Sequence, residues 1–107
     1  MHKTKLSEPE RQRRSRAAQL VSSYPLLRGS LLIRYVRCGK TPCKCASGEG
    51  HRAAYLVQSR HGKTRQTYIP KSGEADVEQA LENYRRLREL IDELSEFEWT
   101  RIKISKG

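Results

Sequence analysis

Residues 73–97 are the segment that most limits the folds open to this chain, because an apolar residue recurs there every three or four positions. That spacing predicts an amphipathic helix, with Ser72 as its N-cap and two acids in its first turn. A helix of 25 residues is about 37 Å long. It would therefore extend beyond a sheet of short strands. The apolar positions are Ala80, Tyr84, Leu87, Ile91 and Leu94, with Val77 and Leu81 beside them.

Three segments before this helix have the composition of β-strands, at about residues 30–37, 53–60 and 64–69. The last two flank a turn at His61-Gly62, which predicts a hairpin. Further upstream, residues 8–22 predict a helix that a Tyr24-Pro25 pair ends.

The expected fold class is therefore α+β, with an N-terminal helix, a three-stranded antiparallel sheet and a long C-terminal helix packed on the sheet. We expect residues 1–7 to be a disordered basic tail and residues 8–107 to be a single small domain, with its sheet within 29–70. The overhanging part of the long helix would meet the first helix or a second copy. In the tail, 98–107, Thr100 to Ile104 suggest a short extra strand anchored by Trp99.

All three cysteines lie between the first two predicted strands, in the loop RCGKTPCKCASGEGH. Three thiolates and one imidazole are the number and type of ligands that a structural zinc ion prefers. A small core also often needs a staple of this kind. The sequence thus predicts a zinc-type loop whose ligands are Cys38, Cys43, Cys45 and His51.

Other uses of the cysteines stay open. An odd number of cysteines argues against a disulfide framework, and a polar loop argues against three inert buried thiols. A reactive thiol would need an oriented base, and no such set is visible. His61, water or a partner group are alternatives to His51 as the fourth ligand.

The net charge of +10 is unevenly distributed. Residues 26–71 hold ten lysines and arginines against one acid, whereas 72–107 hold six basic and nine acidic residues. A region of one sign points to a polyanionic partner. Tyr35, Tyr55 and Tyr68 fall one on each strand, either as core residues or as a platform for unpaired bases. The candidate nucleic-acid contacts are Arg13, Arg14, Arg16, Arg34, Arg37, Lys40, Lys44, Arg52, Arg60, Lys63 and Arg65.

The run from Gly29 to Leu90 resembles a family of small, uncharacterised prokaryotic proteins often encoded near mobile elements. Matching motifs include Cys38-Gly39-Lys40, Gly62-Lys63 and Asn83-Tyr84-Arg85. The resemblance implies that the three cysteines act together and implies no activity. A weaker likeness of layout is to the arm-binding domains of tyrosine recombinases, which read DNA through a three-stranded sheet.

We therefore expect a zinc-stabilised nucleic-acid-binding module, with duplex DNA favoured over RNA, in the cytoplasm of a prokaryote or in a phage. The alternative is a protein-interaction module, an accessory subunit or inhibitor, that uses residues 77–97 to bind a second copy or a larger partner. An enzyme is not expected, because no acid–base pair or nucleophile set is visible. A membrane partner is not expected either, since no basic helix has a bulky apolar face.

Overall fold

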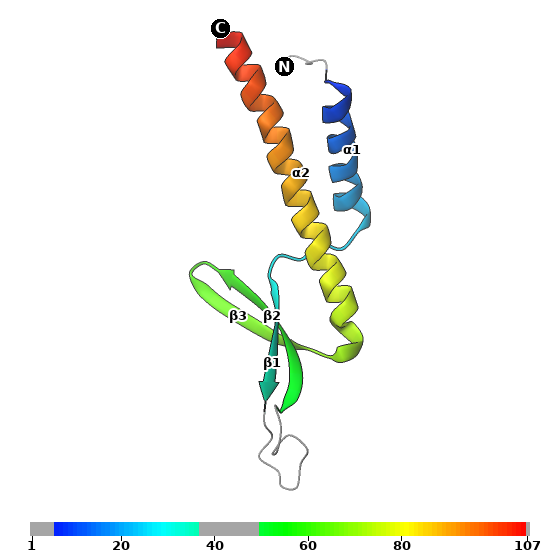
Figure 1. The fold of residues 1–107 in the computed structure, drawn as a ribbon, viewed down its shortest axis with the longest axis vertical. Coiled ribbons are helices and arrows are strands. Elements are labelled where there is room, and N and C mark those ends of the chain that lie inside the picture. Colours follow the sequence, from blue (N-terminus) through cyan, green and yellow to red (C-terminus); the bar gives the residue numbers. More distant parts are fainter. Residues whose placement is uncertain (1–5, 37–49, 107) are drawn as a thin grey trace. The chain divides into compact units, whose positions relative to one another are not determined.

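The structure is a computed structural model that describes residues 6–36 and 50–106. Its elements are α1 (Glu8–Ser23), β1 (Ser30–Val36), β2 (His51–Arg60), β3 (Lys63–Ile69), the short 3-10 helix η2 (Lys71–Gly73) and α2 (Glu74–Lys106), as Figure 1 shows. The predicted fold class is confirmed: an N-terminal helix precedes a three-stranded antiparallel sheet and a long C-terminal helix. Within the described ranges, no helix is long and apolar enough to cross a membrane.

Helix α1 begins where its sequence predicts. The Ser7 hydroxyl accepts a hydrogen bond from the backbone N–H of Glu10 at 3.4 Å, and Pro9 occupies the first turn. This cap satisfies an N–H group that has no partner within the helix. At the other end Tyr24 adopts an extended conformation before Pro25, which ends the helix.

The sheet has the strand order β1-β2-β3, and both pairs are antiparallel (Figure 1). Residues His61 and Gly62 connect β2 to β3 with φ angles of 52° and 77°. Two successive left-handed residues are typical of the tight turn that matches the twist of a hairpin. The predicted hairpin is therefore confirmed, with strands slightly longer than expected.

Helix α2 continues to Lys106, so the predicted extra strand at Thr100 to Ile104 is wrong. The alternating β-branched residues there resemble a strand, but no Gly or Pro interrupts the helix before Gly107. The Thr100 hydroxyl donates to the carbonyl oxygen of Glu96 at 3.1 Å, a bond made within a helix. Trp99 is 62% exposed and does not anchor a tail.

The chain divides into two compact units, and α2 contributes to both. The helical unit comprises Met1–Leu26 and Glu82–Gly107, and the sheet unit comprises Leu27–Leu81. That residues 8–107 act as a single domain stays a prediction.

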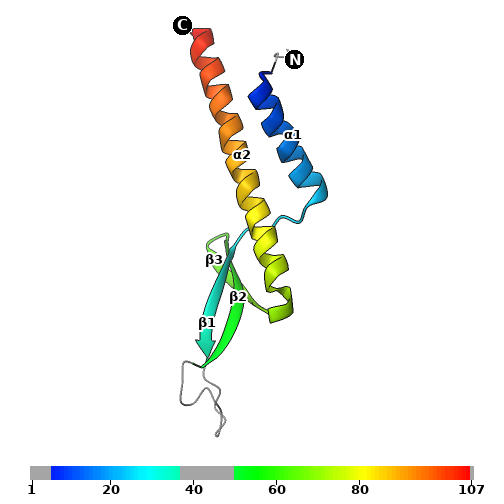
Figure 2. The same ribbon diagram turned by 45° about the vertical axis from the view of Figure 1, so that its right-hand side comes forward.

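In the helical unit, α1 lies antiparallel to the C-terminal part of α2, as the two views in Figures 1 and 2 agree. Its core is Leu20 of α1 against Leu87 and Leu90 of α2, with Ala17 and Leu26 beside them. This confirms that the second half of the long helix meets the first helix. The core is small, since only three leucines are buried in it.

The predicted apolar stripe of the long helix is partly wrong. Ala80 and Leu87 are buried as expected, but Leu90 is buried in place of Ile91, whose side chain is 53% exposed. Asn83 is buried as well. Its side-chain amide donates to the carbonyl oxygen of Pro25 at 3.0 Å, which satisfies this buried polar group. The buried face is thus rotated away from the predicted one along this part of α2.

In the sheet unit, the first two turns of α2 cover one face of the sheet. Ala54, at the centre of that face, is 1% exposed, and Ala80 of α2 is also buried. The backbone N–H of Leu27 donates to the carbonyl oxygen of Ala80 at 3.1 Å, which joins the segment before β1 to α2. Gly29 is required there, since its φ is 151° and a Cβ would lie 2.8 Å from the Val57 carbonyl oxygen.

Candidate nucleic-acid interface

The predicted metal ligands Cys38, Cys43 and Cys45 lie outside the described residues, as do Arg37, Lys40 and Lys44. His51 is described: it is the first residue of β2, it is exposed, and it pairs with Val36, the last residue of β1. The strand pairing therefore continues to the base of the cysteine loop. Among the described residues, no group of three His, Cys, Asp or Glu side chains is placed to hold a metal ion.

A group of cations gathers at the opposite end of the sheet, around the β2–β3 turn. Arg60 and Lys63 are cross-strand partners on either side of the turn, and Arg65 pairs with Gln58. The Arg65 Nε donates to the Gln58 Oε1 at 2.9 Å, and the Gln58 Nε2 donates to the Arg28 carbonyl at 2.7 Å. The Arg28 guanidinium in turn donates to the carbonyl oxygen of Ser59 at 2.9 Å. We call Arg28, Arg60, Lys63 and Arg65 the turn-end cations.

The turn-end cations have no acidic partner among the residues that the structure describes. Within the described part of the chain, no carboxylate lies at ion-pair distance from any of the four. The hydrogen bonds of Arg28 and Arg65 go to neutral carbonyl and amide oxygens, which hold these two side chains but leave their positive charge in place. Exposed cations of this kind attract phosphate oxygens.

Arg52 differs from the turn-end cations, because it forms a bidentate ion pair with Glu74 at the start of α2. The two guanidinium N–H groups donate to Glu74 Oε2 and Oε1, each at 2.8 Å. These hydrogen bonds lower the pKa of Glu74 below its ordinary value and raise the pKa of Arg52. The positive charge predicted to bind nucleic acid at Arg52 is thus largely compensated within the unit.

Arg34 lies on the other face of the sheet, the one that the first two turns of α2, within the described sheet unit, do not cover. Register places Leu32, Tyr55 and Tyr68 side by side on that face, whereas Tyr35 pairs with Arg52 on the covered side. The Arg34 guanidinium carbon is 5.4 Å from the centre of the Tyr55 ring. Alternation along β2 and β3 directs Arg60, Lys63 and Arg65 to the face opposite that of Arg34, so the basic residues of the strands do not share one face.

Two of the three α1 arginines predicted to hold phosphates have acidic partners within the helical unit. Arg13 lies 3.6 Å from a Glu93 carboxylate oxygen, with its guanidinium over the Phe97 ring. Arg14 lies 3.4 Å from Glu10. Arg16 donates to Gln19 at 2.8 Å and lies over the Tyr24 ring, with no carboxylate at ion-pair distance in the described ranges. Of the three, Arg16 alone keeps an uncompensated charge.

Sequence reasoning missed Arg28. It lies outside the predicted strands, and nothing local distinguishes it from a linker arginine. Its position becomes clear only once β1 pairs with β2, which brings residue 28 beside Ser59. The structure thus joins Arg60, Lys63 and Arg65 from the predicted set with one unpredicted member, and it separates Arg34 from them.

Residues 6–79 of the chain match the model of a protein family, the domain of unknown function DUF6788. That is more than half of the 107 residues. The chain belongs to the DUF6788 family. The DUF6788 match covers α1, the cysteine loop, the sheet and the start of α2, and it ends before most of the long helix. Neither a curated protein nor a solved structure shows a significant match to the chain.

Proposed function

We propose that this DUF6788 protein is a zinc-stabilised nucleic-acid-binding module that favours duplex DNA. The observation that supports it is the concentration of uncompensated positive charge in the sheet unit. Arg34 and the turn-end cations have no carboxylate at ion-pair distance in the described ranges, although a bidentate pair forms nearby at Arg52. A polyanion supplies the missing negative charge, and releases counterions as it binds.

The turn-end cations suit the backbone of a nucleic acid better than its base edges. Arg28 and Arg65 donate hydrogen bonds to neutral oxygens of the sheet, and these bonds hold their positive charges in defined positions. Contacts with phosphates set position and supply affinity, and they carry no direct sequence information. The proposed binding is accordingly strongly dependent on salt and weakly dependent on sequence at this end of the sheet.

The zinc part of the proposal rests on the donor set and on the strand pairing. Cys38, Cys43, Cys45 and His51 supply three thiolates and an imidazole, a normal structural set for zinc. The pairing of Val36 with His51 brings both ends of the loop to neighbouring strand ends. A bound zinc ion would supply a cross-link there that a small core lacks.

The binding test compares two matched double variants of the full chain. Replacing Arg60 and Lys63 with Gln removes two uncompensated charges, whereas replacing Arg85 and Arg86 removes two charges that face Glu82 and Glu89. For the wild type we expect the logarithm of the affinity for duplex DNA to fall linearly with the logarithm of salt concentration. The first variant should reduce that slope by about one for each lost phosphate contact, and the second should leave it nearly unchanged. A flat salt response of the wild type would refute the proposed function.

The zinc test measures the metal content of the purified protein. We expect one zinc ion per chain, lost in the Cys43→Ser variant, with a lower melting temperature after chelation. A Lys44→Ala variant serves as the control, since it changes the same loop without removing a donor atom. Absence of zinc from the wild type, purified with zinc present, would contradict this part.

The alternative, a protein-interaction module, is favoured by exposed apolar side chains on α2. Ile91, Trp99 and Ile102 are 53%, 62% and 46% exposed. This function would be supported if the protein bound neither DNA nor RNA and eluted from a size-exclusion column as a dimer or a hetero-complex. Both proposals are compatible with a link to a mobile element or phage, which the family resemblance implies. Neither proposal includes an enzymatic activity.

A further inference from the structure

Within the described part of the sheet unit, the first two turns of α2 leave one face of the sheet uncovered. It carries Leu32, Arg34, Tyr55 and Tyr68, and we call it the open face. Register aligns Leu32, Tyr55 and Tyr68 in one row across the three strands. Leu32 is 40% exposed and Tyr68 is 58% exposed, so the row presents apolar and aromatic surface to solvent.

The aromatic rings of the open face are held in a defined arrangement. The Tyr55 and Tyr68 ring centres are 5.9 Å apart, with an angle of 71° between the ring planes. The Arg34 guanidinium lies over Tyr55 from the other side, 5.4 Å from the ring centre. Edge-to-face packing of this kind fixes ring orientations without covering both ring faces. The more exposed ring, that of Tyr68, therefore retains surface on which a flat group can stack.

The positive charge of Arg34 indicates which kind of ligand suits the open face. A second copy of the open face would bring its own Arg34 against this one, and like charges in contact are unfavourable. A nucleic acid brings phosphates for Arg34 and for the other uncompensated cations of the unit. It also brings planar bases, which stack on aromatic side chains whatever their sequence.

The row of Leu32, Tyr55 and Tyr68 favours unpaired bases over paired ones. In a duplex, each base buries its two flat surfaces against its neighbours, and only its edges are accessible from a groove. Tyr55, Tyr68 and Leu32 offer few groups that read such edges. An unpaired base exposes its flat surface and gains contact with such a row.

We infer that the open face binds unpaired bases, which stack on Tyr68 beside Tyr55 while Arg34 meets the adjacent phosphate. This inference rests on the proposed function and deepens it. The preferred ligand is then a duplex that carries a single-stranded stretch. The open face thus holds the unpaired bases through Tyr68 and Tyr55, and Arg34 on the same face holds their phosphate.

The experiment measures the affinity of the full chain for a labelled duplex and for the same duplex with a short single-stranded overhang. We expect the overhang to be bound about tenfold more tightly, an effect within the range of one stacked base. The Tyr68→Ala variant should lose that preference, and Tyr68→Phe, which keeps the ring, should retain it. Tyr35→Ala is the matched control, because Tyr35 is 55% exposed but lies on the opposite face.

Circular dichroism first establishes that each variant keeps the wild-type spectrum. Equal affinity of the wild type for duplex and overhang overturns the inference and leaves the proposed function intact. The same holds if Tyr68→Ala keeps the preference, since stacking would then not be its cause. Failure of the wild type to bind either DNA overturns the proposed function together with the inference.

Discussion

The sheet unit and the helical unit are both rich in arginine, yet they use it differently. In the helical unit, Arg13, Arg14, Arg86 and Arg101 each have a carboxylate at ion-pair distance. In the described part of the sheet unit, Arg52 alone does so. Net charge along the sequence did not separate these roles, because Arg13 and Arg14 were predicted to hold phosphates. The position of the acids decides whether an arginine stabilises its own unit or remains able to attract a partner.

The two units also differ in what holds them together. The sheet unit has continuous strand pairing from Val36↔His51 to Arg60↔Lys63. The helical unit has no such ladder between its two helices and depends on three buried leucines and on ion pairs. Its side-chain contacts should therefore be the more sensitive to single substitutions.

The largest expected effect comes from Leu90→Ala in the helical unit. Leu90 is 1% exposed and packs on Leu20 and Leu87. Removing a buried leucine costs about 2–5 kcal/mol, and we expect the lower half of that range because so thin a core can partly collapse. Ile91→Ala is the matched control: Ile91 is 53% exposed, and its loss should cost no more than about 0.5 kcal/mol.

Urea denaturation followed by circular dichroism measures both variants. The DNA affinity of both variants is also measured, in the absence of urea. Leu90→Ala should leave that affinity nearly unchanged, because the proposed contacts belong to the sheet unit. Equal destabilisation by the two variants would contradict the burial pattern of α2.

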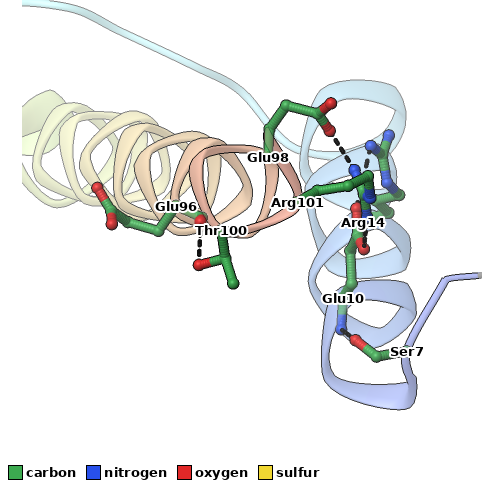
Figure 3. A network of polar contacts seen from close by, with 7 residues as sticks. All are labelled: Ser7, Glu10, Arg14, Glu96, Glu98, Thr100 and Arg101. Carbon is green, nitrogen blue, oxygen red and sulfur yellow. Dashed lines mark hydrogen bonds and ion pairs between the residues drawn. The ribbon is translucent and has the colours of Figure 1, made fainter. Parts of the chain in front are cut away.

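The second effect concerns a buried carboxylate. Glu10 is 2% exposed, and it accepts hydrogen bonds from Arg101 at 2.8 Å and from Arg14 at 3.4 Å, as Figure 3 shows. Arg101 also contacts Glu98, so it joins two acids of the unit. Arg101→Ala leaves Glu10 with one exposed partner, and we expect a loss of about 1–3 kcal/mol of stability.

Arg85→Ala is the control for Arg101→Ala, since it removes an exposed partner of Glu82 and should cost less than about 1 kcal/mol. A double variant tests the cause. Replacing Glu10 and Arg101 together with Leu should destabilise less than Arg101→Ala, because no buried charge is then left without its main partner. If the double variant is the less stable, the ion pair does not act as described.

Local sequence patterns predicted most of the elements but not the pairing between distant residues. The Pro25 break and the turn at Gly62 are local signals, and both were confirmed. Leu90 and Ile91 are adjacent and both apolar, so spacing alone allows either to face a partner. Contact with Leu20 of α1 determines which is buried.

The candidate site was predictable to a smaller extent. The sequence shows that basic residues lie near the strand ends and that side chains alternate along each strand. It does not show the register between β1, β2 and β3, which assigns each residue to one face of the sheet. Arg28 and the Glu10–Arg101 pair became apparent only in three dimensions, because their partners are 31 and 91 residues away. Contacts across such separations have no local signature in the sequence.

The smallest expected effect tests the exception in the sheet unit, the pair of Arg52 and Glu74. The hydrogen bonds from Arg52 lower the pKa of Glu74 in the folded protein. The pair thus stabilises the unit above the unfolded pKa of Glu, about 4.3, and this contribution is lost as the pH falls through the folded pKa. We expect the stability difference between wild type and Glu74→Gln to be present at about pH 6 and to shrink below about pH 4.

Glu74 also lies in the first turn of α2, where any acid favours the helix dipole. Asp76→Asn is the control for that contribution, because Asp76 lies in the same turn and forms no ion pair with Arg52. Thermal denaturation at a series of pH values, in low salt, measures both variants. If the two behave alike, the effect belongs to the helix dipole, and the sheet unit then has no ion pair of consequence among its described residues. That result would make the contrast with the helical unit larger, because Arg52 would join Arg34 and the turn-end cations as a charge available to a partner.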